Sequence, residues 1–173
     1  EACKRLSVNG ETPGMAAVIG LKSDDVEKIL DSVDGAYPAN YNSPVQTVIA
    51  GTKGALARAE DLFKEAGARR VLSLKVGGPF HTPLLSEAKS AFESYMEQYT
   101  FADPVIPVYS NVTGNRIETG TEIKANCGNH LVSPVRWTSI ENQIEHDSWE
   151  QLLETGPGTV LSGLWKSSGN SGT

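Results

Sequence analysis

The residue best suited to chemistry is His81, which lies in the segment GGPFHTPLL at residues 77–85. The Thr82-Pro83 pair after it predicts a helix start, because proline is favoured at the first helical position. A histidine just ahead of a helix experiences the positive end of the helix dipole, which disfavours imidazolium. A neutral imidazole can take a proton from a hydroxyl nucleophile and return it later. His81 is therefore either a general base or an ordinary turn histidine with a satisfied hydrogen bond.

The composition narrows the class of protein. The chain has 173 residues, of which 39% are hydrophobic, and this is enough for a real core. A formal net charge of -6 argues against a nucleic-acid partner, and no apolar run approaches the roughly 18 residues of a membrane span. Cys3 and Cys127 lie far apart and form no Cys/His cluster, so we expect no metal site and a reducing compartment.

Residues 14–76 alternate between strand-like and helix-like patterns. Ser23 and Thr52 are candidate N-caps of two helices, and Gly67 lies where the second helix would end. The strands are expected at 14–21, 36–44, 45–51 and 69–76. The resulting order of strand, helix, strand, strand, helix, strand is the ferredoxin-like βαββαβ arrangement of an α/β protein. Because this arrangement hosts many functions, it predicts none by itself.

The residues after Thr82 predict a second region of mixed structure. An apolar helix face is expected from the spacing of Leu85, Ala88, Phe92, Tyr95 and Tyr99. Further elements are expected as a strand at 104–114, a helix from 121 to about 133, a short helix at 138–146, a strand at 149–158 and a helix at 159–166. The composition of residues 167–173 predicts a flexible tail.

The segment GPFHTPLL resembles the histidine motif of malonyl-CoA:acyl carrier protein transacylases and of the related acyltransferase domains of polyketide and fatty acid synthases. Other segments agree with this family in order and spacing, from about residue 12 to about residue 166: PGMAAVIGL, NYNSPVQTVIAG, PVIPVYSNVTG, SPVRW and ETGPGTVLSGL. The resemblance implies a ferredoxin-like small subdomain at 14–77. It also implies that 78–166 is the C-terminal part of an α/β-hydrolase-like acyltransferase domain, and that 1–13 is the end of a large-domain helix and a linker.

The function implied by the resemblance is a Ser-His ping-pong transfer of malonyl from malonyl-CoA to the phosphopantetheine thiol of acyl carrier protein. His81 matches the general base. His130 stands where the family usually has a glutamine whose main-chain carbonyl orients that base. We expect the same main-chain role for His130, although an imidazole there is also able to alter the pKa of His81, and a histidine exposed at a helix end is an equal alternative.

Several residues match the substrate-binding positions of the family. Phe80 matches the aromatic residue that accompanies malonyl preference, and simple core packing is the alternative role. Arg69 and Arg70 match a basic pair that would contact CoA phosphates or the acidic carrier protein, and solvated charges at a helix end are the alternative. Asn42 and Val160 match residues that face the cleft.

The loop at Gly156 and Gly158 matches another part of the cleft lining, although a tight turn would explain it equally well. His146 is expected at the surface. No permanently bound cofactor is implied, and the localisation implied is cytoplasmic, or an organelle matrix in a eukaryote.

Three parts of the family's sequence are not found in these 173 residues: the G-x-G-x-Q segment of the oxyanion hole, the G-H-S-x-G nucleophile elbow, and the arginine that pairs with the malonyl carboxylate. We therefore expect a missing N-terminal half to act as a partner, and the chain alone to be inactive. The alternative is a non-catalytic ferredoxin-like module that binds CoA or carrier protein. A small-molecule-sensing domain is a weaker third hypothesis, because it leaves the matches after residue 77 unexplained.

Overall fold

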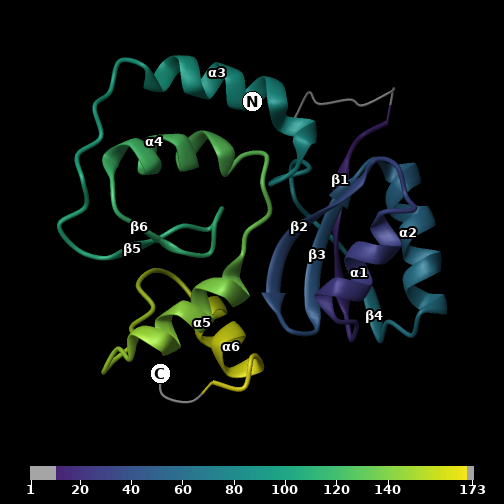
Figure 1. Cartoon of the computed structure of the whole chain (residues 1–173). Helices are drawn as coiled ribbons and strands as arrows, with labels where there is room; N and C mark the ends of the chain where they lie inside the picture. The colour runs from purple at the N-terminus through teal and green to yellow at the C-terminus, as the bar shows by residue number, and fades with distance from the viewer. Residues whose placement is uncertain (1–10, 171–173) are drawn as a thin grey trace.

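A computed structural model describes residues 11–170. The predicted 1–13 segment and 167–173 tail therefore lie partly outside the described residues. The first six elements occur in the predicted order and are β1 (Gly14–Ile19), α1 (Ser23–Leu30), β2 (Ala36–Ser43), β3 (Gln46–Gly51), α2 (Lys53–Glu65) and β4 (Arg70–Leu74). The four strands form one antiparallel sheet in the order β2-β3-β1-β4 (Figure 1).

Both faces of this sheet bury apolar side chains. Successive residues of β1 point to opposite faces, so Ala16 and Val18 join one cluster while Met15 and Ala17 join the other. The first cluster lies under α1 and α2 and contains the fully buried Phe63 of α2. The second cluster continues towards the rest of the chain, because its outer members come from the end of β4 and from the segment that follows it.

The two predicted N-caps of this region have different outcomes. The Thr52 hydroxyl accepts from the Ala55 amide at 3.2 Å, so the prediction for α2 is confirmed. The prediction for Ser23 is wrong: α1 begins at Ser23 itself, after Lys22 as N-cap, and no side chain caps it. The reason is tertiary, because the Ser23 hydroxyl lies 3.3 Å from the Thr47 hydroxyl on β3 instead of turning back to its own helix.

The remaining elements lie beyond the β2 edge of the sheet (Figure 1). They are the 3-10 turn η2 (Pro83–Leu85), α3 (Ser86–Met96), β5 (Val108–Tyr109), β6 (Arg116–Ile117), α4 (Gly120–Asn129), α5 (Trp137–Asp147) and α6 (Val160–Ser167). The strand predicted at 104–114 is reduced to its two-residue pairing with β6. No helix among residues 11–170 is both long and apolar enough to cross a membrane.

The strand predicted at 149–158 is not formed. A strand needs a neighbour to bond its main chain, and nothing in the described part of the chain lies beside this segment as a strand. The segment instead serves α6. The Glu154 carboxylate accepts from the main-chain amides of Leu161 and Ser162 at 3.0 and 2.9 Å, which satisfies the first turn of that helix.

The apolar face predicted for the helix after Thr82 is formed but only partly buried. Leu85 and Met96 are buried, whereas Phe92, Tyr95 and Tyr99 are exposed. The two tyrosine hydroxyls lie 2.8 Å apart at the surface. In the link to β5, Val105 and Ile106 are 100% and 70% exposed.

Main-chain bonds join the sheet to the segment between α4 and α5. Val135 lies along the outer edge of β2, where its amide donates to Ala39 and its carbonyl accepts from the Tyr41 amide, both at 2.8 Å. The guanidinium of Arg136 lies 5.7 Å from the centre of the Tyr41 ring. The SPVRW segment thus closes one edge of the sheet and fixes the position of the chain just after α4.

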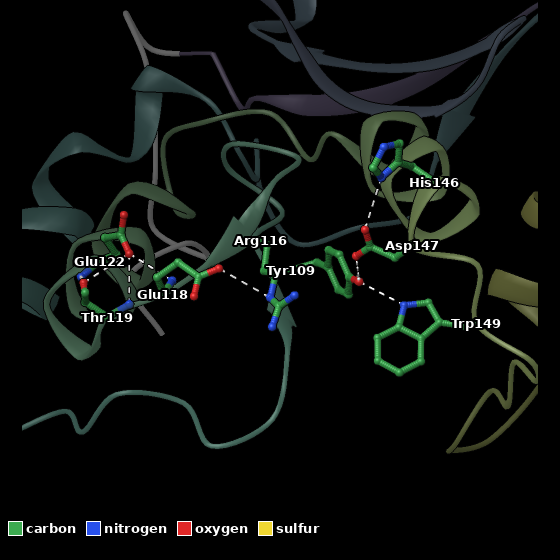
Figure 2. Close-up of polar contacts among 8 residues, drawn as sticks. All are labelled: Tyr109, Arg116, Glu118, Thr119, Glu122, His146, Asp147 and Trp149. Atoms are coloured by element: carbon green, nitrogen blue, oxygen red, sulfur yellow. Dashed lines mark hydrogen bonds and ion pairs between the residues drawn. The ribbon is translucent and has the colours of Figure 1, made fainter.

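Side-chain bonds hold the small β5–β6 pair against the helices (Figure 2). The Tyr109 hydroxyl donates to the Asp147 carboxylate at the end of α5 and accepts from the Trp149 indole N–H at 2.9 Å. Figure 2 also shows the capping box of α4, in which the Thr119 hydroxyl accepts from the Glu122 amide at 3.2 Å and the Glu122 carboxylate accepts from the Thr119 amide at 3.0 Å. This box fixes the start of the helix that ends at His130.

Candidate active site

His81 lies in a tight turn between β4 and η2, in a backbone conformation that few residues other than glycine adopt. Its φ angle is +62°, in the left-handed region, where an L-residue costs roughly 1–2 kcal/mol. Thr82 is fully buried and donates its hydroxyl to the Pro79 carbonyl at 2.7 Å, which closes the turn. The helix start predicted at Thr82-Pro83 is confirmed, since Thr82 is the N-cap residue of η2 and Pro83 its first residue, but the Thr82 hydroxyl bonds the turn and does not cap η2. Strain held by the surrounding structure is common at functional sites.

The His81 ring is anchored through one nitrogen. Its Nδ1 lies 2.8 Å from the main-chain carbonyl oxygen of His130, 49 residues further along the chain. A carbonyl only accepts hydrogen bonds, so Nδ1 carries the proton. In the neutral ring Nε2 then holds the free lone pair and is the atom that can accept a proton.

The His130 side chain also contacts His81. The two rings are stacked with their centres 4.7 Å apart and their planes at 29°. The Nε2 of His130 lies 3.3 Å from the Asn111 side-chain amide, which is a donor. Burial lowers the pKa of His130, and the proximity of His81 lowers it further. His130 is therefore neutral at neutral pH, with Nε2 as acceptor.

Local sequence explains how these groups are placed. His130 is the C-cap residue of α4, so its carbonyl is free of the helix and available to His81. Asn111 lies in the turn between β5 and β6, and its carbonyl accepts from the Arg136 amide at 2.8 Å. Within this turn the buried Ser110 hydroxyl accepts from the Val112 amide at 3.1 Å. The sequence pattern predicts no role for Asn111 in the site, although the turn chemistry of SNVTG marks its position.

The predicted substrate residues are distributed over two places. Phe80 lies next to His81, half-buried, and packs against the outer cluster of the sheet together with Leu74. Arg70, in contrast, begins β4, and about 13 Å of strand separates it from Leu74 at the end that leads to His81. The exposed Arg69 adjoins Arg70 and donates its amide to Ile19 at 2.8 Å.

Asn42 lies at the same end of the sheet as this arginine pair. It is the penultimate residue of β2, next to Ser43, which pairs with Gln46 of β3. Gln46 pairs with Ile19, which pairs in turn with Arg70. Val160 is the first residue of α6 and is 69% exposed. No hydrogen bond within residues 11–170 joins His81 to any of these outlying positions.

The other candidate positions lie at the surface. Gly156 and Gly158 have φ angles of +125° and +91° and are exposed, so they form an open turn ahead of α6. The side chain of His146 is 81% exposed, as predicted for a surface residue. Among the described residues, no group of His, Cys, Asp and Glu side chains is arranged to hold a metal ion.

Comparison with known proteins gives consistent matches. A malonyl CoA-acyl carrier protein transacylase of Haemophilus influenzae is 39% identical over 158 residues, which are 90% of this chain and 51% of that protein. An acyl carrier protein S-malonyltransferase of Vibrio cholerae, solved by crystallography, is 40% identical with a TM-score of 0.87 over 91% of this chain and 52% of its own. The chain is a homologue of the malonyl CoA-acyl carrier protein transacylases.

The fold of this chain also matches that of a transacylase solved in complex with its carrier protein. A malonyl-transacylase solved together with a type II polyketide synthase acyl-carrier protein is 36% identical, with a TM-score of 0.89 over 96% of this chain and 54% of its own. The resemblance predicted from the motifs is thus confirmed, as is an α/β fold like that of the solved transacylases. The chain spans about half the length of the transacylases that it matches. No family model matches it.

Proposed function

We propose that this chain supplies the histidine base of a malonyl transacylase, which moves malonyl from malonyl-CoA to the phosphopantetheine thiol of acyl carrier protein. The observation that carries the proposal is the bond between His81 Nδ1 and the His130 carbonyl, because it leaves Nε2 as the proton acceptor. The names of the homologous proteins supply the substrate and the carrier.

The proposed reaction has two half-reactions at the same base. His81 Nε2 takes the proton of a serine hydroxyl while the serine oxygen attacks the thioester carbonyl of malonyl-CoA. The tetrahedral intermediate expels the CoA sulfur, which receives the proton from the imidazolium. In the second half, Nε2 takes the proton of the phosphopantetheine thiol, the sulfur attacks the malonyl-serine ester, and the serine oxygen leaves with that proton. In both halves the His130 carbonyl stabilises the transient imidazolium by a charge-assisted hydrogen bond.

The nucleophile of this scheme must come from a partner segment. The 173 residues contain no G-H-S-x-G elbow, and we infer that the missing half of the transacylase provides it. The exposed side chains of α3 and the following link support this inference, since Phe92, Tyr95, Val105 and Ile106 are large apolar side chains that another part of a large domain could cover.

The proposed division of the chain into subdomains also follows from its homology to the transacylases. Residues 14–77 would be the ferredoxin-like small subdomain and residues 78–166 the C-terminal part of the large acyltransferase domain. The strand order β2-β3-β1-β4 and the two helices on one face support the first assignment. The proposed compartment is the cytoplasm, or an organelle matrix in a eukaryote.

Roles for the remaining predicted residues are proposed by position. Phe80, beside the base, would limit the space next to the malonyl α-carbon. Arg69, Arg70 and Asn42 lie at the far end of the sheet, so they would contact the remote part of CoA or the carrier protein and not the reacting atoms. Val160 would line the outer part of the cleft. Malonyl-CoA acts as substrate in this scheme, and no permanently bound cofactor is required.

The proposal is tested by joining the chain to the G-H-S-x-G half of a homologous transacylase. Transfer of radiolabelled malonyl from malonyl-CoA to holo acyl carrier protein is then measured for the joined protein and for the 173-residue chain alone. We expect transfer only by the joined protein. Transfer by the chain alone would refute the claim that these 173 residues lack the nucleophile. A well-folded joined protein that binds CoA or carrier protein without transfer would favour the non-catalytic binding module.

A further inference from the structure

The imidazole of His130 is not explained by the role of its carbonyl. Any side chain would leave the main-chain oxygen in place, yet this one lies flat against His81 with ring centres 4.7 Å apart. It is also held from its far end, since Nε2 of His130 lies 3.3 Å from the Asn111 amide nitrogen. The Asn111 amide thus contacts the His130 ring, and the His130 ring in turn contacts the His81 ring.

A single hydrogen bond fixes the Nδ1 atom of His81 but only weakly fixes the plane of its ring. The terminal torsion of a histidine side chain has broad minima, so rotation about it is soft. A neighbouring ring at stacking distance limits this rotation, because tilting the His81 ring would bring its edge into the other ring. The direction in which Nε2 points depends on the same torsion.

We propose that the His130 imidazole, held by the Asn111 amide, is a positioning residue that fixes the plane of the His81 ring and so directs Nε2 towards its reaction partner. The positioning itself concerns only this chain. The identity of the reaction partner as a serine hydroxyl rests on the proposed function.

The charge state of His130 agrees with this role. Ionisable groups on the elements around the pair include Cys127 of α4, Tyr109 of β5, Glu93 of α3 and Arg136 ahead of α5. None of them is a cause of the lowered pKa of His130, which comes from burial and then from His81. His130 therefore stays neutral at neutral pH, and its Nε2 remains an acceptor for the Asn111 amide.

The test uses nuclear magnetic resonance of the 173-residue chain, which requires no enzymatic activity. Imidazole nitrogen shifts at pH 7 report which nitrogen of each histidine carries the proton. We expect one tautomer for His81, with the proton on Nδ1. His130→Ala should keep this tautomer, because the main-chain carbonyl remains, but should lower the order parameters of the His81 ring C–H bonds in carbon relaxation. Asn111→Ala should have the same effect in weaker form. His146→Ala, at an exposed position, is the matched control and should change nothing.

A second readout uses the opposite substitution. His81→Asn removes the ring that opposes protonation of His130, and it keeps an amide that can donate to the His130 carbonyl. The pKa of His130 should therefore rise towards its ordinary value. The proposal is overturned if the order parameters of the His81 ring are unchanged in His130→Ala while the amide spectrum shows an intact fold. If that variant does not fold, unchanged order parameters of the His81 ring in Asn111→Ala overturn it instead. Failure of the joined protein to transfer malonyl would refute the proposed function and leave the positioning result standing.

Discussion

The turn that carries Asn111 depends on Gly114. Replacing Gly114 gives the sharpest test of how this turn packs against α5. Gly114 has a φ angle of +73°, and a Cβ added there would lie 2.4 Å from the Cβ of Ser139 on α5. Neither atom can swing aside, because each is fixed to its own backbone. Left-handed strain costs about 1–2 kcal/mol and overpacking about 1–3 kcal/mol, so Gly114→Ala should lower the free energy of unfolding by about 2–5 kcal/mol.

Gly67→Ala is the matched control for this prediction. Gly67 also has a positive φ, +91°, but an added Cβ would meet nothing within 4 Å. The two variants share the backbone strain and the loss of unfolded-state freedom, so overpacking alone should separate them by about 1–3 kcal/mol. Urea unfolding followed by tryptophan fluorescence measures both.

A double variant then identifies the contact. Ser139→Gly removes the atom that the new methyl group would strike, so it should destabilise the otherwise unchanged protein but recover stability in Gly114→Ala. A coupling of about 1–3 kcal/mol between the two positions is expected. Equal losses for Gly114→Ala and Gly67→Ala, or no coupling with Ser139→Gly, would refute the reasoning about this turn.

Two further predictions concern the helices that support the site. Glu141 is buried, and burial raises its pKa against the lowering effect of the hydrogen bonds from Ser168 and Trp137. The Glu141 carboxyl therefore binds its proton more tightly in the folded protein than in the unfolded chain. The resulting stabilisation of the folded protein is present below the ordinary pKa near 4.5 and is lost as the pH rises through the raised pKa. As the pH is raised from 4 to 7, the free energy of unfolding of Glu141→Gln should rise relative to that of the unchanged protein. A relative fall over the same range in urea unfolding would contradict this. Thr119→Ala breaks the capping box with Glu122 and should cost about 1 kcal/mol, while Thr119→Ser should cost much less. Equal losses in thermal unfolding would exclude the hydroxyl as the cause.

Local pattern was sufficient to predict much of the sheet. The alternation and turn residues between residues 14 and 76 predicted all six elements in order, and the Thr52 cap was correct in its details. The segment GPFHTPLL marks His81 as a candidate base through its resemblance to the family motif, and that role stays a prediction.

Features that depend on partners distant in the sequence could not be predicted. Ser23 has the right chemistry for a cap, but its hydroxyl is directed to Thr47 by the packing of α1 on the sheet. Residues 149–158 have a strand-like composition without a neighbouring strand, and Glu154 caps α6 instead. The contact of the His130 ring with Asn111 depends on how α4 lies against the β5–β6 turn, which no local pattern reports.

The central claim is that His81 is the proton acceptor of malonyl transfer, and His81→Asn in the joined protein tests it most directly. Asparagine tolerates a positive φ angle and can still donate to the His130 carbonyl, so the turn and its hydrogen bond are retained. It cannot take a proton from serine. We expect kcat/KM for malonyl transfer to fall by about 10²–10⁴-fold with the fold intact. Transfer at close to the rate of the unchanged protein would contradict the account.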